Sequence, residues 1–213
     1  MEGINHDQVT DWFRDNVPDI SPPLNFGLIS GGKSNLTYQV TDQEGKAFVL
    51  RRPPLGHVLE SAHDMYREHR IISSLHGTDV PVAKTFGICQ DKAVTGADFF
   101  VMACVEGTVV HNVDAAETIS EQNRYTFGKH SVEVLVALHL IEPNDVGLGD
   151  LGRREAYLDR QLKRWTGQWE ATKTHSEPGM DELLTLLHER KPHQVGSAIV
   201  HGDYRAGNLM HQG

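Results

Sequence analysis

The most informative stretch of the 213-residue chain is Ile199-Val-His-Gly-Asp-Tyr-Arg-Ala-Gly-Asn-Leu-Met210, where a short apolar run leads directly into a polar loop. Within this loop, Asp203 supplies a carboxylate that can accept a proton. Asn208, five positions later, supplies an amide oxygen of the kind that hard cations bind. The spacing His-x-Asp-x-x-x-x-Asn predicts a catalytic loop. The competing interpretation is a polar surface turn, because Asp, Gly and Asn are common in turns.

The composition limits the classes of protein to which the chain can belong. Hydrophobic residues make up 38% of the sequence and charged residues 23%, which predicts an ordinary soluble, globular protein. The formal net charge of −9 argues against a dedicated nucleic-acid binder, which usually carries a concentrated basic face. No stretch approaches the roughly 18 apolar residues of a membrane span, and the N-terminus does not resemble a signal peptide. We therefore expect a cytoplasmic protein with no nucleic-acid or membrane partner, and the composition favours no particular oligomeric state.

The cysteines and histidines give little indication of a metal centre. Cys89 and Cys104 are the only cysteines, which is too few for a disulfide scaffold, and we expect both to be buried thiols. The 13 histidines include no H-E-x-x-H motif, so a histidine metal site is the less favoured interpretation.

The first half of the chain predicts a small α+β lobe. Val9, Trp12 and Phe13 recur at helical spacing between Asp7 and Asn16, which predicts a short leading helix. Three β-rich runs follow, and the segments between them are typical of hairpin turns. The predicted strands are residues 24–29, 36–41 and 47–50. We therefore expect three antiparallel strands in succession.

The first of these turns contains a phosphate-binding motif in an unsuitable context. Gly27-Leu-Ile-Ser-Gly-Gly-Lys33-Ser34 matches the Walker A pattern G-x-x-x-x-G-K-[ST]. A Walker A loop needs a helix that begins at the Lys-Ser pair, whereas the next residues, from Asn35 to Thr41, favour a strand. We therefore favour a glycine turn whose backbone amides can close over phosphates, with Ser34 and Asn35 assisting. A Walker A nucleotidase centred on Lys33 and a plain hairpin turn are the alternatives.

A cation and a carboxylate occupy positions from which they could meet. Arg51 ends the third predicted strand, and the Pro53-Pro54 pair stops the strand, so we expect Arg52 to be solvated. The apolar spacing of residues 61–75 predicts an amphipathic helix with Glu68 near its middle. If that helix packs against the sheet, Glu68 can pair with Arg51 and position it. The alternative for each residue is an ordinary surface charge.

Two further strands and a helical second half complete the expected organisation. The strands are residues 80–89 and 99–105, so that a five-stranded lobe ends near Val105. The segment 106–112 is then expected to be a connector, with Gly107 as a candidate hinge. The predicted helices are residues 121–141, which follow a capping box at Thr118-Ile-Ser-Glu121, and residues 158–169 and 183–187. We assign Trp165 and Trp169 to packing.

The chain resembles the aminoglycoside phosphotransferase family, which is related to the protein kinases. The shared features are the glycine turn, the cation that closes the third strand, the helix with a central Glu, the connector and the loop His201-Gly-Asp-Tyr-Arg-Ala-Gly-Asn-Leu209. This loop and Phe48-Val-Leu-Arg-Arg-Pro-Pro54 are most similar to the branch associated with acyl-CoA dehydrogenases. The resemblance implies an α+β, protein-kinase-like fold of two lobes. Residues 1–105 would form the nucleotide-binding lobe, and residues 106–213 an incomplete helical lobe that ends with the catalytic loop.

The resemblance implies a magnesium-dependent transfer of phosphate from ATP to a hydroxyl group of a small molecule. Asp203 would be the catalytic base and Asn208 a magnesium ligand. Arg205 would neutralise the transferring phosphate, with a surface role as the alternative.

The resemblance also implies a nucleotide site in the first lobe. Ser34 and Asn35 would lie beneath the glycine turn, and Arg51, oriented by Glu68, would contact the α- and β-phosphates. The adenine edge would meet backbone groups of Ala103, Cys104 and Val105.

One element of the family pattern falls outside the sequence. Family members carry a second metal-binding Asp beyond the catalytic loop, whereas the sequence ends at Gly213. We therefore expect Asn208 to be the only one of the usual protein metal ligands, which should cost roughly 10²–10⁴ in rate. Apolar helix faces of the second lobe are also expected to be uncovered. The alternative function is therefore a non-catalytic nucleotide-binding module or an inactive fragment.

Overall fold

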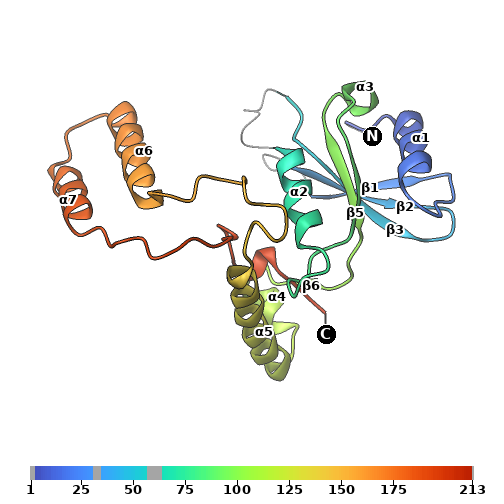
Figure 1. Cartoon of the computed structure of the whole chain (residues 1–213). Coiled ribbons are helices and arrows are strands. Elements are labelled where there is room, and N and C mark those ends of the chain that lie inside the picture. The colour runs from blue at the N-terminus through green and yellow to red at the C-terminus, as the bar shows by residue number, and fades with distance from the viewer. Residues whose placement is uncertain (1–2, 31–34, 57–63, 213) are drawn as a thin grey trace. The chain divides into compact units, whose positions relative to one another are not determined.

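The computed structural model describes residues 3–30, 35–56 and 64–212 (Figure 1). The chain divides into two compact units. The first contains residues 1–138 and 201–213, and therefore holds the sheet and the loop around Asp203. The second contains residues 139–200. Among the described residues, none of the helices combines the length and apolar character that crossing a membrane requires.

The first unit is built on the five-stranded antiparallel sheet that the sequence predicts, with strand order β1-β2-β3-β5-β4. Its strands are β1 (Asn25–Ser30), β2 (Leu36–Thr41), β3 (Ala47–Arg52), β4 (Thr85–Cys89) and β5 (Phe99–Ala103). The strand predicted at residues 80–89 is present as β4, but its predicted start at Val80 was wrong, because β4 begins at Thr85. Pro81 lacks the amide hydrogen that a strand ladder needs, which accounts for the late start.

Helix α1 (His6–Asn16) covers one face of the sheet, and its prediction is confirmed. Asn5 caps the helix by accepting a hydrogen bond from the amide of Gln8. Val9 and Phe13 are fully buried in the core that α1 shares with the sheet. Trp12 packs edge-on against Phe99, with ring centroids 4.9 Å apart.

The expectation that Arg52 is solvated was wrong. Its side chain is only 3% exposed, and its guanidinium donates to the carbonyl oxygens of Gly3, Thr95 and Pro53. Side chains alternate across a strand, so Arg52 lies on the same face of β3 as the buried Leu50. Burial lowers the pKa of Arg52 from its usual value, and the carbonyl partners compensate the desolvated charge.

Helix α2 (Met65–Leu75) lies on the other side of the sheet from α1 (Figure 1). It begins at Met65 because Asp64 accepts a hydrogen bond from the amide of Arg67 at 2.8 Å, which makes it the N-cap. Residues 61–63 of the predicted helix lie outside the described residues. The short helix α3 (Lys92–Thr95), capped by Asp91, was not predicted, because four residues are too few to show a helical period.

The segment after β5 forms a short strand rather than a free connector. Strand β6 (Thr108–Val109) pairs with β7 (Met210–His211), which directly follows the predicted catalytic loop. A Cβ atom on Gly107 would lie 2.6 Å from Met210 Cγ and 2.7 Å from the carbonyl oxygen of His211. Gly107 is therefore the residue that allows these two segments to approach each other.

Helix α4 (Val113–Glu117) and all but the last two residues of α5 (Glu121–Leu140) belong to the first unit. Helix α5 is present as predicted, but the capping box at Thr118 was wrong. Ser120 is the residue whose hydroxyl accepts from the amide of Asn123, whereas the Thr118 hydroxyl donates to the carbonyl oxygen of Ala115 in α4. Thr118 therefore ends one helix, and Ser120 begins the next.

The unit of residues 139–200 contains the two predicted helices, α6 (Tyr157–Thr172) and α7 (Pro178–Glu189). The Gln194 side chain joins the segments that flank them, because it accepts from the amide of Tyr157 and donates to the carbonyl oxygen of Arg154. The assignment of Trp165 to packing was wrong, since its side chain is 55% exposed.

Candidate functional site

The predicted catalytic loop is folded around hydrogen bonds between Asp203 and Asn208. The Asn208 side-chain amide donates to the Asp203 carbonyl oxygen at 2.9 Å and to Asp203 Oδ2 at 2.7 Å. A 3₁₀ turn at Ala206–Asn208 brings the two residues together, and Gly202 supplies the positive φ of 86° that precedes Asp203. The five-residue spacing noted in the sequence therefore corresponds to a direct contact.

The environment of Asp203 favours its ionised form. The hydrogen bond from Asn208 lowers the pKa of the Asp203 carboxyl, and Arg205, whose Nε lies 3.4 Å from Oδ2, lowers it further. The side chain of Asp203 is 68% exposed, so a substrate can reach it. At neutral pH, Asp203 is thus an accessible carboxylate that can accept a proton.

Asn208 has an oxygen atom that could coordinate a cation. Because its Nδ2 atom is used for the hydrogen bonds to Asp203, Oδ1 is the atom that is left to coordinate a hard metal such as magnesium. Within the described parts of the chain, no cluster of three or more His, Cys, Asp or Glu side chains could hold a metal ion. The observed donor set fits magnesium through Asn208 and does not form a complete metal site.

A second group of predicted residues meets between β3 and α2. Arg51 Nε lies 2.7 Å from Glu68 Oε1, so the ion pair expected from the sequence is confirmed. The Nε–H bond does not point along this contact, so charge attraction rather than a directed hydrogen bond holds the pair. Asn35 Nδ2 donates to the other carboxylate oxygen of Glu68 at 3.1 Å. Glu68 thus joins the end of the glycine turn to the cation of β3.

The strand after the glycine turn excludes the Walker A alternative. Residues 36–41 form β2 in register with β3, so no helix follows Lys33 as a P-loop requires. Lys33 and Ser34 themselves lie outside the described residues. The predicted contribution of Ser34 therefore stays a prediction.

The predicted adenine contacts follow the end of β5. The amide of Ala103 donates to the carbonyl oxygen of Lys84 at 2.8 Å, so it is not available to a base. Cys104 is half-buried rather than buried, and its sulfur accepts from Gln39 at 3.9 Å, whereas Cys89 is buried as expected. Val105 is 38% exposed. The predicted adenine contacts therefore rest on the carbonyl of Ala103 and on the backbone of Cys104 and Val105.

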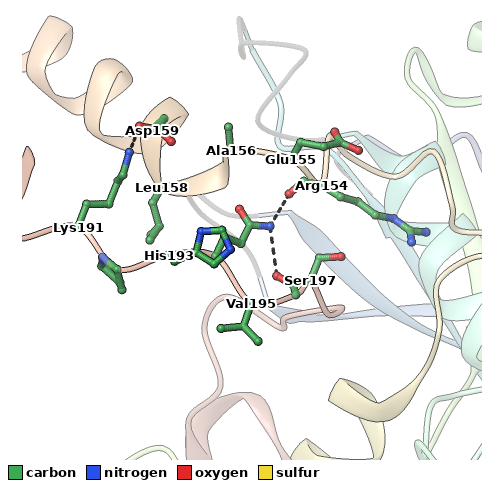
Figure 2. A pocket seen from close by; sticks show the side chains of 12 residues that line it. Arg154, Glu155, Ala156, Leu158, Asp159, Lys191, His193, Val195 and Ser197 are labelled. Carbon is green, nitrogen blue, oxygen red and sulfur yellow. Dashed lines mark hydrogen bonds and ion pairs between the residues drawn. The ribbon is translucent and has the colours of Figure 1, made fainter.

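A cavity of about 480 Å³ lies within the unit of residues 139–200, and none of the predicted site residues lines it (Figure 2). Its wall includes Arg154, Asp159, Lys191, His193 and Gln194. Two of its cations are paired, since Lys191 binds Asp159 and Arg154 binds Glu142. Asp203 and Arg51, the predicted base and the predicted phosphate-binding cation, lie in the other unit.

The fold and the residues brought together define the class of protein. A five-stranded sheet with a cation–Glu pair, followed by a His-x-Asp-x-x-x-x-Asn loop, is the arrangement of the kinase-like phosphotransferases. The chain belongs to the phosphotransferase enzyme family (APH), whose model matches residues 26–213. The resemblance to aminoglycoside phosphotransferases is thereby confirmed.

Known relatives support both the fold and the resemblance to the branch associated with acyl-CoA dehydrogenases. The chain is 33% identical to acyl-CoA dehydrogenase family member 11 of Mus musculus, over 84% of this chain and 23% of that protein. It is 30% identical to family member 10 of the same organism, over 88% of this chain and 17% of that protein. A crystal structure of a candidate aminoglycoside phosphotransferase of Ralstonia eutropha matches with a TM-score of 0.83 and 32% identity, over 97% of this chain and 60% of that one. The chain thus spans about a quarter or less of the length of these curated relatives.

Proposed function

We propose that the protein transfers the γ-phosphoryl group of ATP to a hydroxyl group of a small molecule, with Asp203 as the base. The observation that carries this proposal is the contact between Asp203 and Asn208, because it joins an accessible carboxylate to an amide oxygen suited to a metal. Membership of a phosphotransferase family supports the reaction class.

In the proposed reaction, the substrate hydroxyl oxygen forms a bond to the γ-phosphorus while the bond from that phosphorus to the ADP oxygen breaks. Oδ2 of Asp203 is held by Asn208 and Arg205, so Oδ1 is the atom that would take the hydroxyl proton. Arg205, with its side chain 61% exposed, would turn from Asp203 toward the charge of the transferring phosphoryl group.

The nucleotide would be held by the first unit. Arg51 can bind phosphate oxygens through its planar guanidinium. Its Nε lies against Glu68, which would orient the terminal nitrogens toward the phosphates. Asn35 would fix the carboxylate of Glu68 in turn. The carbonyl of Ala103 and the backbone of Cys104 and Val105 would meet the adenine base.

Magnesium fits this site through Asn208 Oδ1, the atom that the hydrogen bonds of Nδ2 leave to a cation. When bound, magnesium neutralises charge that develops on the phosphate oxygens. The hydrogen bonds from Nδ2 fix the plane of the Asn208 amide relative to Asp203. Oδ1 of Asp203, which would accept the proton, and Oδ1 of Asn208, which would bind the metal, would therefore keep a constant position relative to each other.

The test measures the transfer of labelled γ-phosphate from ATP to a panel of hydroxylated small molecules. Asp203→Asn should lower turnover roughly 10²–10⁴-fold, because it removes the base while keeping the shape of the side chain. Asp15→Asn, an identical change at an exposed position of α1, is the matched control and should leave turnover unchanged. Equal turnover in the wild-type and Asp203→Asn proteins would refute the role of Asp203. Magnesium-independent ATP binding without turnover would instead support a non-catalytic nucleotide-binding module.

A further inference from the structure

The position of the catalytic loop on the first unit is not explained by the contacts of Asp203. In the described parts of the chain, its side chain bonds to Asn208 and Arg205, and its amide donates to His201 Nδ1 at 3.3 Å. All three partners belong to the same loop. These bonds therefore fix the internal shape of the loop, and another residue must fix its place on the unit.

Tyr204, the residue after Asp203, makes a hydrogen bond that leaves the loop. Its hydroxyl donates to the main-chain carbonyl oxygen of Ser131 in α5 at 2.6 Å, a separation of 73 residues along the chain. The side chain is half-buried, and its ring packs edge-on against His201 with centroids 5.4 Å apart. Burial raises the pKa of the Tyr204 phenol above its usual value, so the hydroxyl keeps its proton at neutral pH and stays a donor.

The same part of α5 also holds the chain beyond the loop. One turn before Ser131, the ring of Phe127 packs against His211 of β7, with centroids 5.5 Å apart. The Ser131 hydroxyl donates to the carbonyl oxygen of Phe127 at 2.7 Å. The residue that binds Tyr204 and the residue that packs against His211 are therefore hydrogen-bonded to each other. Asn208 lies between Tyr204 and His211 in the sequence. One turn of α5 therefore fixes the chain on both sides of the metal-binding residue.

We propose that Tyr204 is a positioning residue, whose hydrogen bond to Ser131 sets the place of Asp203 and Asn208 relative to the bound nucleotide. The proposal rests on the proposed phosphotransfer function. A loop displaced by a fraction of an ångström keeps its own hydrogen bonds but loses the alignment of base, hydroxyl and phosphorus. The chemical step should therefore depend on Tyr204, whereas nucleotide affinity, which is carried by Arg51 and the end of β5, should not.

The experiment compares Tyr204→Phe with Tyr125→Phe. Both changes remove one phenolic hydroxyl from the first unit, but Tyr125 is an exposed residue of α5, with 71% of its surface accessible. Two quantities are measured on each protein. The first is hydrogen exchange at the amides of Asn208 and Leu209, which bond to the carbonyl oxygens of Arg205 and Ala206. The second is kcat and KM for ATP, corrected for the folded fraction by thermal unfolding.

In Tyr204→Phe, we expect exchange at both amides to accelerate and kcat to fall, each by roughly tenfold. This factor corresponds to the net free energy of one hydrogen bond. KM for ATP should stay within about twofold of wild type, and Tyr125→Phe should match wild type throughout. Unchanged exchange in Tyr204→Phe would overturn the proposal, and so would faster exchange with an unchanged kcat per folded molecule. A wild-type protein without turnover would refute the phosphotransfer function instead, and exchange alone would then decide whether Tyr204 anchors the loop.

Discussion

At the scale of single residues, Arg51 and Arg52 show how a strand gives two neighbouring, identical side chains different roles. Arg51 faces α2 and forms the ion pair with Glu68. Arg52 points to the opposite face of β3, where main-chain carbonyl oxygens surround it. Arg51 is therefore the side chain for which we propose a phosphate contact, while Arg52 holds the N-terminal segment to the sheet.

Replacement of Arg52 should destabilise the protein rather than alter nucleotide binding. Arg52→Met leaves three carbonyl oxygens without their donor, and we expect the free energy of unfolding to fall by about 2–4 kcal/mol. Arg14→Met is the control, because Arg14 makes an exposed ion pair with Asp11 that should contribute less than about 1 kcal/mol. Urea denaturation of both variants measures the difference. Equal losses would show that the buried hydrogen bonds of Arg52 contribute little.

The hydrogen bond from Asn208 should set the pH dependence of Asp203, the proposed base. Since that bond is the largest cause of the lowered pKa of Asp203, Asn208→Ala should raise this pKa toward the ordinary value. A base works when deprotonated, so activity falls as the pH drops through its pKa. The acid limb of the kcat/KM profile should therefore move to higher pH in the variant.

NMR of the side-chain carboxyl carbons of the Asp residues measures this shift in the pKa of Asp203 without an assay of activity. Asp42 is the internal control. Its burial would raise its pKa, but hydrogen bonds from the amides of Lys46, Ser21 and Glu44 outweigh burial and lower it. Asn208→Ala touches none of these groups, so the Asp42 titration should stay in place. An Asp203 titration that also stays in place would contradict the assigned cause.

At the scale of elements, the pairing of β6 with β7 links the segment after β5 to the predicted catalytic loop. Gly107→Ala should push these strands apart, because the new Cβ would meet backbone of His211 at 2.7 Å. We expect a loss of about 1–3 kcal/mol in the free energy of unfolding. Gly128→Ala should have the opposite sign, a gain of about 0.5–1 kcal/mol, since Gly128 lies inside α5 with open space around it. Two changes of the same sign would contradict the close approach at Gly107.

Elements with a clear period could be predicted from the sequence, and those defined by distant partners could not. The spacing of Val9 and Phe13 and the β-branched residues of β2 each carry their own structural signal. Strands β6 and β7 have two residues each, and their pairing joins positions about a hundred residues apart, so no local pattern announces them. The capping role of Ser120 was missed for a local reason, because Thr118 is followed by Glu121 and fits the capping box, whereas Ser120 is followed by Asn123.

The residues of the candidate site show the same difference between local sequence signals and contacts with distant partners. The partners Asp203 and Asn208 lie on one loop and were found from their spacing, and Arg51 and Glu68 were paired through the expected packing of a helix on the sheet. The bond from Tyr204 to Ser131 joins residues 73 positions apart. The tyrosine next to Asp203 was the only sequence signal for this bond, and a half-buried ring alone does not identify a hydrogen-bond partner.

At the scale of the whole molecule, the two compact units differ in how their helices are stabilised. The sheet unit buries Val9 and Phe13 of α1 against the strands. Helices α6 and α7 of the other unit have no buried residue, and they are 16 and 12 residues long. Isolated helices of this length are only marginally stable in water. Because α6 and α7 have no buried residue, tertiary packing adds little to their stability.

Hydrogen exchange should therefore reveal two levels of protection within one chain. Amides of α6 and α7 should exchange through openings that cost at least about 2 kcal/mol less than those exposing β3 and β5, since local opening of these helices uncovers little apolar surface. Mass-spectrometric exchange at increasing, sub-denaturing urea measures both costs. The amides of α1 are the control, because α1, with 11 residues, is shorter than α6 and α7 but has two fully buried side chains, and it should follow the sheet. If α6 and α7 exchanged only with the global unfolding of the sheet, the two units would unfold as one, and the burial of side chains would not be what sets local stability in this protein.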